Sequence, residues 1–438
     1  MYNVAVVKYE KPSESLKQAI DEAGGLGEIS TDSKVIIKPN IVTWYEGANF
    51  PKYGVLTTAR LIEDIVIILN EHGVKDITLV EGVTEREKIS DSLLQLAVKG
   101  MGLDALTKRY GLKTIDVHKG NFTKVTLGDV KLSVNSDILD ADYIIDMPVM
   151  KTHIQCKVSL GIKNLKGLLN ISSRKRCHNR DQTKNLDYHV TKFADMLSPS
   201  LTIIDGIYTL EYGPGPSGDA RRSDLLVVSK DMISADKVGA KLLGYAPESI
   251  PHIALSATNK DRPADLSDIC LKGNVDVNDA AKLHKWSYER NDSGDMPLLF
   301  EQMGIKGIRF PPFDHTLCTY CAFFVTYSIM GILMAKNADK PFDDIEILYG
   351  KIQKPSGKNK NTLLLGQCQV KLNGNNPMIN HCVKVNGCPP NKEEFFKAYT
   401  TLGIELPDNP TEWMESVPGL FMGKYAGKSE FEETFYKI

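Results

Sequence analysis

The chain has 438 residues, enough for two or three domains, and its 42% hydrophobic and 25% charged residues are ordinary for a folded globular protein. Its formal net charge of −2 gives no reason to expect nucleic acid or an acidic membrane as a partner. The N-terminus reads as a strand and not as a signal peptide, and the apolar run 322–334 is too short to span a bilayer, so we expect no membrane partner.

Short apolar runs alternate with amphipathic stretches over the first 150 residues. The runs predict strands at residues 4–7, 35–37, 77–80 and 143–145, and the stretches predict helices at 13–23, 57–72 and 91–110. Alternation of this kind predicts βαβ units, and so an α/β fold with a mainly parallel sheet flanked by helices. A hairpin is expected at 124–134, turning at Gly128-Asp129.

The same pattern continues with strands at 201–204 and 225–228 and a helix at 233–243. Residues 170–185 are rich in Arg and Lys without apolar spacing, which predicts a solvated surface loop. Pro311-Pro312 marks a boundary, so we expect an α/β domain at residues 1–300 and a cysteine-bearing α+β domain at 311–438. The apolar run 322–334 would be a buried helix of that second domain.

Polar side chains follow several of the predicted strands. Lys38 and Asn40 follow the second strand, Lys151 and His153 the fourth, and Asp205 the fifth. Ligands of open α/β sheets bind just past the carboxyl ends of the strands. We therefore expect these side chains to surround one polar ligand.

The strongest local pattern is Lys151-Thr-His153 followed by Lys163, Asn164 and Lys166 between glycines. Lysines and glycine-flanked backbone N–H groups suit a phosphate or carboxylate, and His153 titrates near neutral pH. We assign catalysis to His153 and Lys151. Substrate binding is assigned to Lys38, Asn40, Lys163, Asn164, Lys166 and Asp205. The glycine–proline loop 212–219 forms either a wall of this site or a surface crossing.

The C-terminal third holds five of the eight cysteines: Cys318, Cys321, Cys368, Cys382 and Cys388. A Cys-x2-Cys pair and a later Cys-Pro are typical of a [4Fe-4S] cluster. Zinc is the less favoured metal, because zinc sites usually have two tight Cys-x2-Cys pairs.

Cys318, Cys321 and Cys388 are the firm cluster ligands. For the fourth ligand Cys368 is favoured over Cys382, because it follows a predicted strand and would be held more rigidly. Cys156, Cys177 and Cys270 are expected to be free buried cysteines. Clustered thiols without an export signal indicate a reducing compartment, so we expect a cytoplasmic protein.

Several motifs of this sequence resemble those of one known family and follow one another in the same order as in that family. They are Lys38-Pro-Asn, Met147-Pro-Val-Met-Lys151-Thr-His153, Lys163-Asn-Leu-Lys-Gly167, and Asp205-Gly through Gly213-Pro-Gly-Pro-Ser-Gly218. The chain resembles the domain of unknown function 362 family over roughly residues 1–280. The resemblance implies an α/β fold and frequent pairing with an iron–sulfur module, but no reaction. The tight two-cluster cysteine runs found in many relatives are absent from this sequence, which indicates one cluster.

Three classes of function follow. The first is an iron–sulfur oxidoreductase that passes electrons between the cluster and a small anionic substrate or cofactor in the cleft. The second is a non-redox isomerase or racemase with a structural cluster. The third is an electron-delivery or assembly protein without its own active site. The sequence is compatible with a redox protein as a partner and with assembly into a homo-oligomer.

Overall fold

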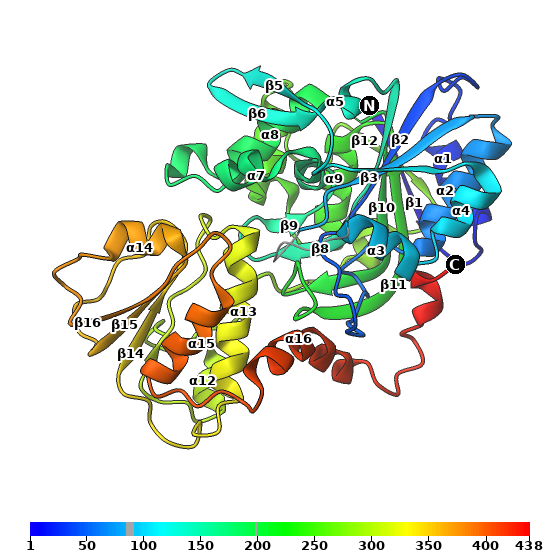
Figure 1. Ribbon diagram of the computed structural model, residues 1–438. Helices are drawn as coiled ribbons and strands as arrows, with labels where there is room; N and C mark the ends of the chain where they lie inside the picture. The colour runs from blue at the N-terminus through cyan, green and yellow to red at the C-terminus, as the bar shows by residue number, and fades with distance from the viewer. Residues whose placement is uncertain (85–91, 198) are drawn as a thin grey trace.

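A mostly parallel β-sheet forms the centre of the larger part of the molecule (Figure 1). The computed structural model describes residues 1–84, 92–197 and 199–438. The strands run in the order β12-β1-β11-β10-β7-β2-β3-β4, with β8 and β9 attached through β10. Their bounds are β1 Tyr2–Lys8, β2 Lys34–Pro39, β3 Asp76–Glu81, β4 Lys113–Asp116, β7 Tyr143–Met147, β8 Val149–His153, β9 Lys157–Ser159, β10 Leu201–Glu211, β11 Asp219–Ser229 and β12 Ile269–Gly273.

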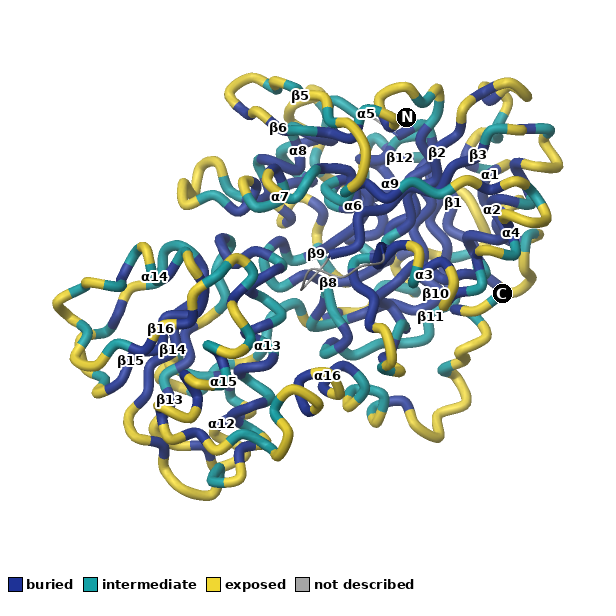
Figure 2. The backbone as a smooth tube through the Cα atoms, in the orientation of Figure 1, coloured by how far each residue is buried: buried dark blue, intermediate teal, exposed yellow. Residues whose placement is uncertain are grey.

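Parallel pairing dominates this sheet, as the alternation of strands and helices predicted. Val35 of β2 pairs with Ile77 of β3 on one side and with Tyr143 of β7 on the other. The antiparallel exceptions in the main path are β1 with β11 and β10 with β11. Central strands such as β2 are buried on both faces, because helices cover both sides of the sheet (Figures 1 and 2).

Helices connect and cover these strands. They are α1 Glu14–Glu22, α2 Ala59–Glu71, α3 Leu93–Gly100, α4 Asp104–Tyr110, α5 Ser136–Leu139, α6 Gly161–Asn164, α7 Ile171–Cys177, α8 Leu186–Leu197, α9 Met232–Leu242, α10 Pro251–Thr258 and α11 Val277–Ala280. The helix predicted at 91–110 is two helices, since Gly102 adopts a φ of +72° between α3 and α4. Asp91, its predicted first residue, lies outside the described residues.

The hairpin prediction is confirmed, and the surface-loop prediction is wrong in part. β5 (Phe122–Leu127) and β6 (Val130–Asn135) pair antiparallel across Gly128-Asp129. Residues 170–185, expected as a solvated loop, contain α7. Asn170 caps α7 by accepting from the Ser173 N–H, and Arg174 turns inward to bind backbone carbonyls, which overrides the absence of apolar spacing.

A second sheet of four parallel strands forms the smaller part of the molecule. Its order is β13-β14-β15-β16, and the strands are β13 Ile308–Arg309, β14 Ile345–Leu348, β15 Asn361–Leu365 and β16 His381–Val385. The associated helices are α12 Leu298–Gln302, α13 Thr319–Leu333, α14 Gln367–Asn373, α15 Lys392–Thr401 and α16 Pro410–Leu420. As predicted, the apolar run 322–334 lies within one helix, α13, up to its C-cap Met334. Phe300 of α12 packs into this second core, so the smaller unit begins before Pro311.

The C-terminal tail returns to the larger unit. After α16 the chain runs back along the first domain, where Figure 1 draws it in red. Tyr425 and Tyr436 belong to the first hydrophobic core, and the Ile438 N–H donates to the Met101 carbonyl at 3.0 Å. Residues 311–438 therefore do not form one spatial unit, because the last residues of this interval belong to the hydrophobic core of the larger unit.

No helix in the described ranges is long and apolar enough to cross a membrane.

Candidate functional site

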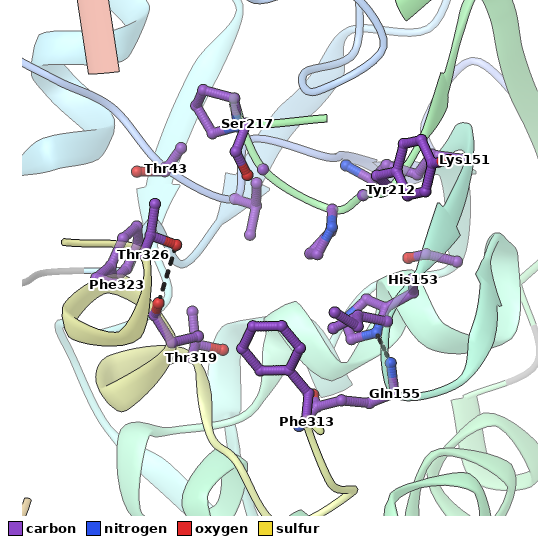
Figure 3. Close-up of a pocket in the computed structure, with 18 of the residues that line it drawn as sticks. Thr43, Lys151, His153, Gln155, Tyr212, Ser217, Phe313, Thr319, Phe323 and Thr326 are labelled. Atoms are coloured by element: carbon purple, nitrogen blue, oxygen red, sulfur yellow. Dashed lines mark hydrogen bonds between the residues drawn. The ribbon is translucent and has the colours of Figure 1, made fainter. Parts of the chain in front are cut away.

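A cavity of about 610 Å³ lies between the carboxyl ends of the large sheet and helix α13. Figure 3 shows Lys151, His153 and Tyr212 on one side of it and Thr319 and Phe323 of α13 on the other. The two units of the molecule thus share the walls of one cavity. Interfaces between domains are common positions for ligand sites.

The predicted site residues gather at this cavity, with one exception. Its lining includes Lys38, Asn40, Lys151, His153, Lys163, Asn164 and Lys166. Asp205 is not part of the lining. It is 1% exposed and accepts hydrogen bonds from the N–H groups of Thr58, at 2.7 Å, and Ile207, at 3.1 Å. Asp205 therefore fastens the beginning of α2 to β10 and does not face a ligand.

The Lys38 ammonium is engaged in an ion pair and hydrogen bonds with neighbouring groups. It donates to Glu81 at 2.9 Å and to the Pro39 carbonyl at 2.7 Å, and both side chains of the ion pair are almost fully buried. Glu81 also accepts from the Ile41 N–H at 2.8 Å. This pair fixes the ends of β2 and β3 and leaves little of the lysine charge for a ligand.

Two asparagines connect Asp146 to Lys151 through hydrogen bonds and so fix the position of the Lys151 ammonium. The Asn164 amide donates to Asp146 at 2.8 Å and accepts from Asn40 at 2.8 Å, while Lys151 donates to Asn40 at 2.6 Å and to the Val55 carbonyl at 2.7 Å. Burial, followed by the charge of Lys163, holds the pKa of Lys151 well below its usual range.

His153 is a neutral imidazole in this setting. Its Nδ1 accepts from the Gln155 N–H at 3.1 Å, a bond drawn in Figure 3. Burial, then the charges of Lys163 and Lys166, lower the pKa of His153 well below its usual value. With Nδ1 accepting, the proton sits on Nε2, the nitrogen left for a ligand.

Lys163 and Lys166 supply the positive charge of the cavity. Within the described ranges the Lys163 ammonium makes no hydrogen bond or ion pair, and burial lowers its pKa. Lys166 contacts His178 Nε2 at 2.8 Å, and burial, then Lys163, lowers its pKa to about 8. The carboxylates of the lining are engaged elsewhere: Glu81 with Lys38 at 2.9 Å, Asp219 with Lys424 at 2.7 Å and Glu289 with Lys285 at 2.6 Å. The unengaged charge of the cavity is thus positive.

Sequence reasoning missed several residues of the lining. Arg174 and His178 come from the segment expected as a solvated loop, although their basic character was a signal. The glycine–proline loop forms a wall, from Tyr212 to Ser217, so the first of its two interpretations holds. The α13 side chains that face the cavity had no signal beyond the apolar composition of their helix.

Four cysteine thiols lie near one another at the beginning of α13. The Cys321 thiol donates a hydrogen bond to Cys318, which lowers the pKa of Cys318 to about 5. The same bond, burial, and the charges of Cys318, Cys368 and Cys388 raise the pKa of Cys321. Cys382, on β16, stands outside this group: burial raises the pKa of its thiol, and Lys384 is the charge that acts on it.

The backbone around these thiols leaves room for them. Gly366, at the end of β15, has a φ of +87°, and a Cβ there would lie 3.0 Å from the Cys321 sulfur. Only glycine allows this close approach in this conformation. Among the described residues, no group of three or more His, Cys, Asp and Glu side chains is arranged to hold a metal ion.

Basic side chains surround the same four thiols. The charge of Lys351 lowers the pKa of Cys318 and, together with Arg180, works against the burial that raises the pKa of Cys368. The Lys175 ammonium lies 3.4 Å from the Cys388 carbonyl oxygen. Lys175 and Arg180 come from the segment around α7, so the larger unit supplies part of the surroundings of the cysteines.

The remaining cysteines lie apart from this group. Cys156 and Cys177 are buried in the first domain, and burial raises the pKa of both thiols. Cys270, which was expected to be buried as well, is only partly buried, because it lies on β12 at the edge of the large sheet.

Comparisons with known proteins agree with the motifs in the sequence. Residues 35–241 match the family model described as Domain of unknown function (DUF362), so the resemblance is confirmed over this region. A thylakoid-associated protein from Synechocystis sp. is 25% identical over 248 residues, which cover 55% of this chain and 72% of that protein.

Two solved structures are distantly similar. The lactate racemase apoprotein from Thermoanaerobacterium thermosaccharolyticum has 11% identity and a TM-score of 0.34, over 52% of this chain and 54% of that one. A protein from Thermotoga maritima has 12% identity and a TM-score of 0.31, over 57% and 59%. The chain spans little more than half the length of either, and likenesses this distant carry no information on the reaction.

Proposed function

We propose that this protein, whose residues 35–241 match the DUF362 family, is a cytoplasmic iron–sulfur oxidoreductase that acts on a small anionic substrate in the cavity. Cys318, Cys321, Cys368 and Cys388 would hold one [4Fe-4S] cluster. The observation that carries the proposal is the position of α13. Its beginning holds Cys321, and its next turns line the cavity with Ala322, Phe323 and Thr326.

The cysteine group suits a cluster in its chemistry. Four thiolates are the usual ligand set of a [4Fe-4S] cluster. The group here also has four thiols, since the charges of Cys318, Cys368 and Cys388 all act on the Cys321 thiol. Nearby Lys351 and Arg180 would balance the negative charge of a thiolate-bound cluster. Glycine at position 366 keeps the space beside the Cys321 sulfur free of a side chain. When bound, the cluster would supply single electrons next to the cavity wall.

On the substrate side, each cavity residue has a role that follows from its contacts. Lys163 and Lys166 would hold the anionic group of the substrate, because Lys163 has no other partner in the described part of the chain and Lys166 has a neutral one. His153 would donate or accept a proton at Nε2. Lys151, held by Asn40 and with its pKa lowered first of all by burial, is a second candidate base.

Anaerobic purification followed by iron and sulfide analysis tests the cluster. We expect a brown protein with absorbance near 400 nm and about four irons and four sulfides per chain. Ser substitution at Cys318, Cys321, Cys368 or Cys388 should remove the colour. Cys382→Ser is the matched control from the same unit and should keep it, as should Ser variants of Cys156, Cys177 and Cys270. Stoichiometric zinc without labile sulfide would overturn the proposal.

Reduction by dithionite, followed by electron paramagnetic resonance, separates two functions. A signal from a reduced cluster supports the oxidoreductase. A cluster that stays oxidised would instead support a non-redox isomerase or racemase of a carboxylic acid, for which His153 and Lys151 offer two buried groups with lowered pKa values.

A further inference from the structure

We propose that the ligand of the cavity is an anionic amphiphile: a carboxylate or phosphate head at Lys163 and Lys166, with a linear apolar chain along α13. This inference rests on the proposed function in taking the same cavity as the substrate site. It goes further in naming the shape and the chemical class of the ligand.

The polar end of the cavity selects an anion. Lys163 faces it without a hydrogen bond or ion pair among the described residues, and Lys166 lies beside it with only the imidazole of His178 as its hydrogen-bond partner. Glu81, which also lines this end, is paired with Lys38 at 2.9 Å. Both lysines are partly buried, and a cation in such a place is stabilised when an anion joins it, so this end of the cavity suits a negative group.

The opposite wall is apolar along a helix. The side chains of α13 that line the cavity include Ala322, Phe323, Met330 and Leu333, together with Thr319 and Thr326. These positions recur at intervals of three and four residues and are only partly buried by the protein, whereas Phe324, Val325 and Ile332 on the other face are packed into the second core. Helix α13 is thus apolar on both faces: one is packed into the second core, and the side chains of the other lie at the edges of the cores and stay only partly buried where they line the cavity.

The apolar wall is long. From Thr319 to Leu333 the lining follows nearly the whole of α13, which corresponds to roughly 20 Å of helix. Beyond it, Val417 and Pro418 of α16 and Phe421 continue the apolar lining. A small polar substrate would leave most of this surface against water. A chain attached to the anionic head would cover it.

Figure 3 shows how the two kinds of wall face each other. Lys151 and His153 lie opposite Phe323 and Thr319, and Phe313 closes one side between them. A molecule with its charged head beside the β8 wall would therefore lay its chain against α13. The apolar contact would fix its orientation, and the head would sit next to His153.

Titration calorimetry with n-alkyl carboxylates from four to twelve carbons, below their micelle concentrations, tests the inference. Affinity should tighten about fourfold per added CH₂ until the chain fills the groove. Alkyl phosphates of the same lengths distinguish the two heads, and alkyl alcohols should bind far more weakly than either. Equal affinity for acetate and decanoate, or for decanoate and decanol, would overturn the proposal.

Matched variants locate the two ends. Lys163→Met should weaken decanoate binding at least tenfold, whereas Lys184→Met, an exposed lysine paired with Asp129, should not. Met330→Gln should weaken long chains about tenfold and butyrate hardly at all. Met334→Gln, an exposed methionine at the end of the same helix, is its control. An unchanged affinity in both Lys163→Met and Met330→Gln would place the ligand elsewhere.

Iron and sulfide content of the same samples separates this inference from the proposed function. Binding that depends on chain length in a protein without a cluster would contradict the oxidoreductase proposal and support the amphiphile site. An intact, reducible cluster in a protein that shows no such binding would support the oxidoreductase proposal and contradict the amphiphile site.

Discussion

The ammonium group of Lys166 lies 2.8 Å from Nε2 of His178. On its other side, His178 Nδ1 lies 3.2 Å from the His315 carbonyl oxygen, and the His178 carbonyl accepts from Lys351. Lys351 in turn acts on the thiols of Cys318 and Cys368. The residue that ends α7 thus joins the cavity to the cysteine group.

Anion binding in the cavity should depend on pH through Lys166. Burial, then Lys163, lowers the pKa of Lys166 to about 8, so the group is positively charged below pH 8 and neutral above it. Affinity for a carboxylate probe should therefore be nearly constant from pH 6 to 7.5 and fall several-fold by pH 9. Calorimetry across this range measures the effect.

Lys166→Met should bind the probe more weakly at pH 7 and show a flatter profile. Lys184→Met, outside the cavity, should reproduce the original profile. A profile that stays steep in Lys166→Met would assign the titration to another group.

The buried pair of Lys38 and Glu81 should be costly to break. Both side chains are at most 3% exposed, so removing one partner leaves an uncompensated charge in the interior. We expect Lys38→Met to lower the free energy of unfolding by roughly 3–5 kcal/mol in urea. Lys113→Met breaks the exposed pair with Asp76, 3.1 Å long, and should cost under about 1 kcal/mol. Similar losses in both variants would contradict the reasoning.

Asp205 should matter for stability and not for binding. Its two oxygens accept separate N–H groups, from Thr58 and Ile207, and an asparagine can satisfy only one of them. Asp205→Asn should therefore destabilise the protein by about 1–3 kcal/mol while leaving the affinity for an anionic probe within twofold. Urea unfolding and calorimetry on the same variant give both values. A large loss of affinity in a folded Asp205→Asn variant would instead show that Asp205 takes part in ligand binding.

The C-terminal tail should stabilise the first domain. Tyr436 is 1% exposed, packs against Tyr53 and Tyr208, and accepts from the Gly54 N–H at 3.2 Å. Tyr436→Ala should lower the free energy of unfolding by roughly 3–5 kcal/mol, the usual cost of removing a buried aromatic ring. Tyr436→Phe, which keeps the ring, should cost about 1 kcal/mol. If both variants unfold like the original chain, the tail is not part of that core.

Much of the fold could be predicted from local patterns. The β-branched runs at 35–37 and 77–80 became paired parallel strands, and the turn at Gly128-Asp129 formed the predicted hairpin. These elements depend on periodicity and turn chemistry, which are properties of neighbouring residues. The break between α3 and α4 was missed, because it depends on Gly102, whose backbone lies against the C-terminal residue Ile438.

The sequence by itself determined which residue types are available: lysines and a histidine after predicted strands, and cysteines in the last third. Strand ends of one parallel sheet must meet at one edge, so most of the predicted cavity residues met there. Only the tertiary structure decided what each group is free to do. Lys38 and Lys163 are both lysines beside the cavity, yet Glu81 forms an ion pair with the first, and no described carboxylate forms one with the second. The second wall, α13, comes from a distant part of the chain, and a contact between distant segments leaves no local pattern from which it could be predicted.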